Sequence, residues 1–333
     1  MTSRLFLAAL ALLVLSSHDM FLKLDDYHLP PDREATIQLF NGTFERSDNT
    51  IDRNRMIDVS LVAGGQRTRL DSSQWTERDS TTYLHFRTGA PGTYAVGLST
   101  RSRDFTMEAE AFNNYLEHDG VLDMLELRRE NGTLNDEARE RYSKHVKTIF
   151  QVGETLTDDW KTVLGYPIEF VPLENPYAAH AGHAVKFRLL RGGEPLADQL
   201  VYAAAAGDGH VHTHDGEDEP HDHTTGTTQL RTDADGIISV DLTSDGVWYL
   251  RTIHLVESDE PGLTHESNWS TLTFQVGVGD HEHGAMAGGH AHDHGEGHSH
   301  SHAHKQAGPP AYVWWGGSLL LIGGLFFWFN RRS

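Results

Sequence analysis

The feature that most constrains the fold is a series of short segments in which apolar and polar residues alternate between turns. Alternation with a period of two predicts β-strands with one buried face. Turns that contain Gly or Pro, such as residues 233–236 and 261–262, separate several of the segments. About seven such strands within roughly 110 residues are expected of an immunoglobulin-like β-sandwich. The segments are 168–171, 184–190, 199–205, 227–231, 237–242, 247–256 and 270–276.

The first half of the chain shows the same alternation and then changes period. Strands are predicted over 36–40, 58–62, 81–86, 93–98 and 142–152. The Gly/Pro-rich residues 89–92 predict a hairpin between two of these strands. Residues 107–116 and 121–130 instead place apolar residues at helical spacing.

The sequence therefore predicts a mainly β protein with two β-sandwich domains. The first covers residues 18–160 and carries a two-helix insertion at about 107–141. The second covers residues 161–278 and is immunoglobulin-like.

The two ends predict export and anchoring. Residues 1–17 read as a signal peptide, whose apolar run 5–15 is too short to span a bilayer. Residues 311–329 are long enough for one transmembrane helix, and Arg331 and Arg332 in the tail 330–333 favour the cytoplasmic side. We expect a single-pass protein of the inner (cytoplasmic) membrane that contacts lipid through this helix, with its N-terminal ectodomain in the periplasm.

A histidine-rich linker, residues 279–310, precedes the predicted membrane helix. Its segment 281–304 holds nine of the chain's 23 histidines among Gly, Ala, Ser and a few acids, which cannot build a core. Imidazole suits Ni²⁺, Co²⁺, Zn²⁺ and Cu²⁺, so the tract predicts metal capture, with a solvated spacer as the alternative. The candidate ligands are His281, His283, His290, His292, His294, His298, His300, His302 and His304.

A second histidine-rich segment, residues 207–226, interrupts two predicted strands and is far longer than a normal hairpin loop. It mixes imidazoles with carboxylates, a ligand set suited to divalent transition metals, although a solvated acidic loop has the same composition. The chain has no cysteine, which excludes thiolate sites, and its net charge of −21 argues against nucleic-acid binding. The candidate ligands are His210, His212, His214, His221 and His223.

Several phrases together resemble a known family. They are HDMFLK at 18–23, RYSKHVKTIFQVG at 141–153, LGYPIEFVPLENPY at 164–177, TDADG at 232–236 and DGVWYLRTIH at 245–254. The chain resembles a bacterial family of exported proteins that is filed as a domain of unknown function and described as the periplasmic component of nickel or cobalt uptake systems. The resemblance implies two β-sandwich domains and a transition-metal-binding role beside an inner-membrane transporter. It carries over two motif positions, His18 and His254.

Both motif histidines have a plain structural alternative. Cleavage after Ser17 would leave His18 as the first residue, whose α-amine and imidazole could chelate one metal ion, whereas most mature N-termini are frayed. His254 ends a predicted strand on the face of Trp248 and Leu250, where a buried core histidine is equally expected.

We therefore expect a membrane-anchored periplasmic binding protein that captures a divalent transition metal for an inner-membrane transporter. Nickel or cobalt is favoured, with zinc and copper as alternatives. The sequence lacks the common motifs of nucleophilic, nucleotide-dependent and zinc-protease catalysis. Two other functions stay open: a copper-dependent oxidase or monooxygenase that uses the N-terminal histidine chelate, and a non-catalytic scaffold ectodomain.

Overall fold

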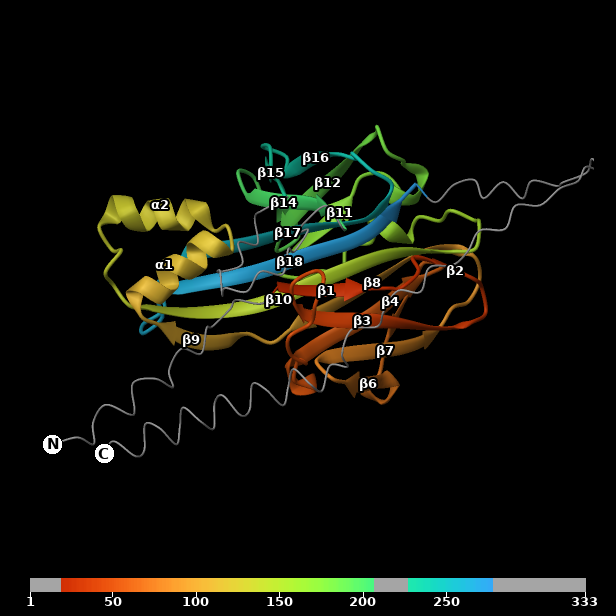
Figure 1. Cartoon of the computed structure of the whole chain (residues 1–333), viewed down its shortest axis with the longest axis horizontal. Coiled ribbons are helices and arrows are strands. Elements are labelled where there is room, and N and C mark those ends of the chain that lie inside the picture. The colour runs from red at the N-terminus through yellow and green to blue at the C-terminus, as the bar shows by residue number, and fades with distance from the viewer. Residues whose placement is uncertain (1–18, 207–226, 278–333) are drawn as a thin grey trace, which may run out of the picture. The chain divides into compact units, whose positions relative to one another are not determined.

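The computed structural model describes residues 19–206 and 227–277 (Figure 1). The predicted signal peptide, His18, the loop 207–226, the linker and the predicted membrane helix lie outside these residues. Within the described ranges, no helix is long and apolar enough to cross a membrane.

The described chain is mainly β, as predicted, and its strands form three sheets. The first sheet has the order β1-β3-β7-β6, where β1 is Asp19–Lys23, β3 Glu34–Gly42, β7 Thr81–Arg87 and β6 Trp75–Arg78. The third sheet has the order β11-β12-β13 with β16 also on β12, where β11 is Ile168–Pro172, β12 Ala184–Arg191, β13 Glu194–Pro195 and β16 Ile237–Asp241.

The central sheet is the largest and has the order β15-β14-β17-β18-β10-β8-β4-β5, with β2 and β9 also paired to β10. Its strands are β15 (Thr228–Arg231), β14 (Leu200–Ala205), β17 (Gly246–Glu257), β18 (His265–Val276), β10 (Ala138–Val152), β8 (Gly92–Thr100), β4 (Met56–Ala63), β5 (Gln66–Arg69), β2 (His28–Leu29) and β9 (Arg103–Met107). Short 3-10 turns occur at η1 (Arg53–Arg55), η2 (Ser72–Gln74), η3 (Asp159–Lys161) and η4 (Pro176–Ala178).

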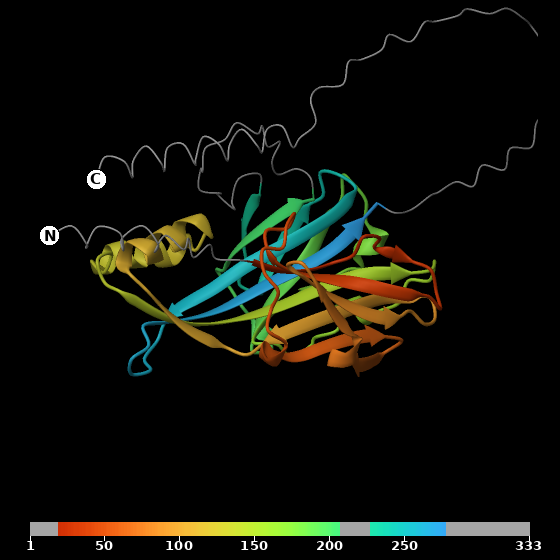
Figure 2. The ribbon, with the colours of Figure 1, turned by 60° about the horizontal axis from the view of Figure 1, so that its bottom comes forward.

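Two sandwich-like packings share this central sheet. On β10, Val146 and Phe150 point into the core beneath the first sheet, whereas Ile149 points into the core beneath the third sheet. The outer sheets therefore cover opposite faces, and Figure 2 shows the central strands running between them. The parallel pairing of β10 with β18 joins the two halves, so strands from both sides of residue 160 belong to one sheet.

The predicted hairpin at residues 89–92 is wrong. β7 pairs with β3 and β6 in the first sheet, whereas β8 pairs with β10 and β4 in the central sheet. The turn therefore carries the chain from one layer to the next. All nine residues of β8 are buried, because other layers cover both of its faces.

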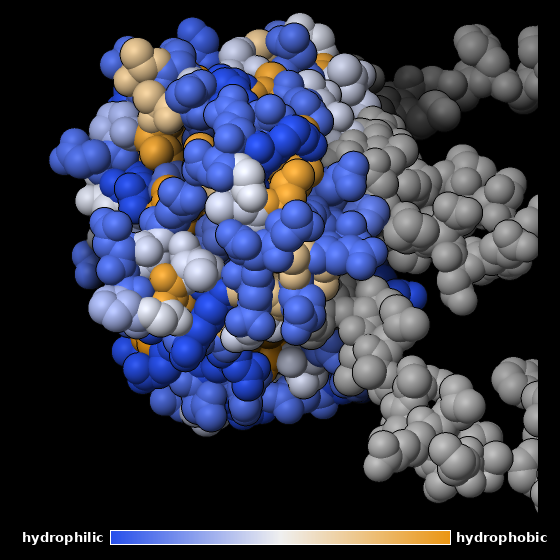
Figure 3. All heavy atoms as spheres, turned by 90° about the vertical axis from the view of Figure 1, so that its left-hand side faces the viewer, coloured by the Kyte–Doolittle hydropathy of each residue, from blue (hydrophilic) through white to orange (hydrophobic). Residues whose placement is uncertain are grey.

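The two helices predicted within residues 107–141 are present as α1 (Ala109–His118) and α2 (Leu122–Asn131). Phe112 and Leu116 of α1 pack on Ile253, Leu255 and the ring of Trp269. These contacts cover the ends of β17 and β18, which extend further than predicted. The helices lie at the left in Figure 1, and the surface seen from that side is mostly hydrophilic with small separate apolar patches (Figure 3).

Candidate functional site

His254 is the one predicted metal ligand that lies within the described residues. His18, the five loop histidines and the nine tail histidines lie outside them. His254 is only 9% exposed, and burial, with a smaller contribution from Arg191, lowers its pKa to about 4. Its imidazole is therefore neutral at pH 7, and its Nδ1 atom has no hydrogen-bond partner among residues 19–206 and 227–277. A neutral ring with an open nitrogen has the protonation state that metal ligation requires.

The side chain of His254 lies on the face of β17 that is turned away from the beginning of β1. The predicted alternation along β17 is confirmed, because Trp248 and Leu250 lie in the core beneath the third sheet, while Ile253 packs against the helices. Arg251, on the same face as Ile253, forms a buried ion pair with Asp19 at 3.0 Å. His254 thus lies on the opposite face of β17 from the side chain that binds Asp19.

Two histidines that are not among the predicted ligands come together in the fold. The rings of His180 and His183 have centroids 3.7 Å apart, and both side chains are exposed. Backbone hydrogen bonds hold their loop: the His183 N–H donates to the His180 carbonyl, and the Gly182 N–H donates to the Leu242 carbonyl. The Ala181 N–H also donates to the carboxylate of Asp245 at 2.7 Å. The loop therefore presents two neighbouring imidazoles to solvent.

This loop lies at the end of the described fold from which both histidine-rich segments continue. The Gly277 N–H, the last described one, donates to the Ala179 carbonyl at 3.1 Å, and the Ala206 N–H, just before residues 207–226, donates to the Val247 carbonyl. Gly246, next to Val247, pairs with Val276. In Figure 1 this end of β18 points away from α1 and α2.

No group of three His, Cys, Asp or Glu side chains that could hold a metal ion occurs within residues 19–206 and 227–277. The pair of His180 and His183 therefore supplies two ligands at most from the described part. Two histidines three positions apart in a loop carry little signal by themselves, so only the close approach of their rings in the structure singles out this pair.

Sequence reasoning also missed a set of buried polar side chains on β10. His145 is 2% exposed; its Nδ1 lies 2.9 Å from Ser99 Oγ and its Nε2 3.0 Å from Ser143 Oγ, and burial lowers its pKa to about 4. Lys147 forms a buried ion pair with Glu169 of β11 at 2.7 Å. His145, Lys147 and Glu169 lie in two of the phrases that carried the family resemblance. Their polarity made them look exposed, and only the covering of both faces of β10 buries them.

Comparison with solved structures gives distant matches. The D0–D1 domain of intimin is 11% identical, with 77% of this chain and 97% of that chain covered and a TM-score of 0.19. Trypsin-activated alpha-2-macroglobulin from Escherichia coli is 10% identical, with 78% and 16% covered and a TM-score of 0.20. A DUF4785 family protein from Legionella pneumophila is 10% identical, with 69% and 50% covered and a TM-score of 0.21.

No curated protein matches the chain. A family model, by contrast, matches residues 15–256, which is most of the sequence and includes each phrase quoted above. The chain belongs to the family described as "Domain of unknown function (DUF4198)".

Proposed function

We propose that this protein is a periplasmic binding protein for a divalent transition metal, with nickel or cobalt favoured, held at the inner membrane by the predicted helix 311–329. In this proposal the segments 207–226 and 281–304 capture the ion and an inner-membrane transporter receives it. The ion is cargo, so weak and numerous ligands suit the role better than one closed site.

The observation that carries the proposal is the exposed pair of His180 and His183, 3.7 Å apart, at the end where both histidine-rich segments continue from the fold. Metal–imidazole bonds are about 2 Å long, so two rings this close can reach one ion after a small rotation. A third and fourth ligand would come from the histidine-rich segments. The net charge of −21 also favours accumulation of cations near the protein.

The test is calorimetric titration of the full-length protein with Ni²⁺, Co²⁺, Zn²⁺ and Cu²⁺, together with metal analysis of the loaded protein. Deleting residues 281–304 should lower the number of bound ions and leave the thermal transition unchanged, because the tract contributes no core. The double variant His180→Asn/His183→Asn should weaken the tightest class of these sites at least tenfold. His118→Asn, at the helix end of the fold, is the matched control and should change nothing.

Equal binding by the deletion variant, the double variant and the wild type would contradict metal capture at this end. The predicted N-terminal chelate has its own test. Adding one Ala before His18 in the mature protein displaces the α-amine but keeps the imidazole, so a chelate site should lose at least tenfold in affinity. A strain that lacks the protein should grow poorly when the transported metal is scarce.

A further inference from the structure

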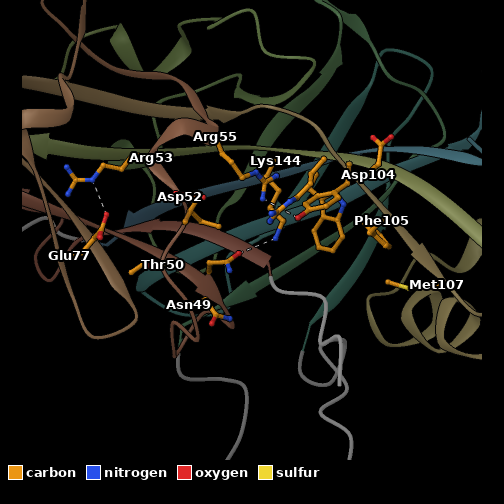
Figure 4. A pocket seen from close by; sticks show the side chains of 15 residues that line it. Asn49, Thr50, Asp52, Arg53, Arg55, Glu77, Asp104, Phe105, Met107 and Lys144 are labelled. Carbon is orange, nitrogen blue, oxygen red and sulfur yellow. Dashed lines mark hydrogen bonds and ion pairs between the residues drawn. The ribbon is translucent and has the colours of Figure 1, made fainter. Parts of the chain in front are cut away.

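A pocket of about 830 Å³ is lined by Trp269 in the first half of β18 (Figure 4), whereas Ala179, next to the His180–His183 loop, bonds to Gly277 just beyond the other end of that strand. Its walls come from the end of β3, the segment 49–55, β6, β9, β10 and β18. This volume is in the range of pockets that bind small organic molecules, which usually combine apolar walls with a few polar groups.

Part of the pocket lining is apolar and aromatic. Trp269 and Phe105 contribute rings, and Met107 and Ile51 contribute aliphatic surface. The Trp269 ring is fixed, because its Nε1 donates to Ser267 Oγ at 3.0 Å and the ring of Tyr115 stacks on it. A preformed aromatic wall of this kind suits a flat apolar group.

The inner part of the pocket carries positive charge. Lys144 is only 6% exposed, and its Nζ lies 4.8 Å from the centre of the Trp269 ring and 3.3 Å from Asn41 Oδ1. Arg55 lies 5.0 Å from the centre of the Tyr142 ring and donates to its hydroxyl at 3.2 Å. Figure 4 shows the two cationic side chains close together in the middle of the pocket.

Of the three acids that line the pocket, Glu77 and Asp104 are engaged by other cations, and the third, Asp52, is exposed. Glu77 accepts from Arg53 at 3.0 Å, and Asp104 accepts from Arg141 at 2.9 Å. Burial is the largest cause that lowers the pKa of Lys144, to about 8. The charge of Arg55 acts in the same direction, whereas the charges of Asp19 and Asp119 partly offset the shift. An anion placed between these two cationic side chains would be attracted by both of them.

We propose that this pocket binds a small organic anion, a carboxylate or sulfonate on an aromatic or branched aliphatic body, with Lys144 and Arg55 at the acidic group and Trp269 against the apolar body. The site shares no residue with the metal-capture end, so each proposal can fail alone.

The experiment uses the full-length protein and two fluorescent probes of nearly the same shape. 8-Anilinonaphthalene-1-sulfonate carries the charge, and N-phenyl-1-naphthylamine is the same body without it. The wild type should bind the sulfonate at least tenfold more tightly than the neutral probe. Lys144→Met should abolish this preference, whereas Lys186→Met, an exposed lysine of β12, should keep it. Trp269→Phe should reduce energy transfer from tryptophan to the bound sulfonate.

Two further measurements keep the proposal falsifiable. Affinity for the sulfonate should fall as the pH rises through 8 in the wild type, because Lys144 loses its proton, and should stay level in Lys144→Met. If Lys144→Met does not fold, as judged by circular dichroism, Arg55→Met tests the same pocket and should lower the preference for the sulfonate. Equal affinity for both probes, or an unchanged preference in the folded variants, would overturn the proposal.

Discussion

Replacing Glu169 with Gln tests whether the buried ion pair between β10 and β11 is needed for stability. Lys147 and Glu169 are 2% and 3% exposed, and their Nζ and Oε2 atoms are 2.7 Å apart. Glu169 Oε2 also accepts from the N–H of Leu164, and Oε1 accepts from the N–H of Gly165, so Gln keeps a carbonyl oxygen for only one of these donors. The change therefore removes the negative charge and one acceptor, and it leaves an ammonium group buried without its counterion.

The expected loss follows from two limits. Breaking a buried pair by removing one partner typically costs about 3–5 kcal/mol. The penalty for the buried charge has an upper limit, because Lys147 can release its proton instead of staying charged. From the unfolded pKa of 10.5, that release costs about 4.8 kcal/mol at pH 7 and about 2 kcal/mol at pH 9. Burial lowers the folded pKa of Lys147, so its contribution to stability is highest above pH 10.5 and falls as the pH drops. The loss in Glu169→Gln should therefore be larger at pH 7 than at pH 9.

The assay is urea unfolding of the full-length protein at both pH values, monitored by tryptophan fluorescence. The double variant Lys147→Met/Glu169→Gln should recover most of the loss, because no charge stays buried. Asp158→Asn, which breaks the exposed pair of Asp158 with Lys161, should cost less than about 1 kcal/mol. A loss below about 1 kcal/mol for Glu169→Gln at pH 7, or an equal loss at pH 9, would refute the reasoning.

Three further predictions concern other buried groups. Burial raises the pKa of Glu140 to about 7, so its contribution to folding stability is present below pH 4.5 and is lost as the pH rises through 7. In urea unfolding, the stability of Glu140→Gln relative to wild type should therefore rise by about 3 kcal/mol between pH 4.5 and pH 8. Burial lowers the pKa of His145 to about 4, so stability should fall from pH 6.5 towards pH 4, and His145→Gln should flatten that slope in a melting series. Gly120→Ala should lower the melting temperature more than Gly132→Ala: both have positive φ, but only at Gly120 would the new Cβ lie 2.2 Å from the hydroxyl of Tyr202.

The sequence by itself was enough to predict the class of fold and most of its elements. Period-two alternation marked the strands, and the change to helical period marked α1 and α2, because each element must turn its apolar residues towards a core. The His-rich composition of 207–226 and 281–304 likewise raised the metal hypothesis without any structure. The division into two domains near residue 160 stays a prediction. The central sheet contains strands from both sides of that residue.

The tertiary structure alone decided how the layers are arranged and which polar groups meet. Turn composition at 89–92 is the same for a hairpin and for a crossing between sheets, and only the pairing of β8 with β10 separates the two. His180 and His183 become neighbours through loop hydrogen bonds to strands distant in sequence. Lys144 and Lys147 look solvent-exposed in the sequence, but both faces of β10 are covered. Alternation shows which side of a strand is apolar, whereas burial depends on what the rest of the chain places over the other side.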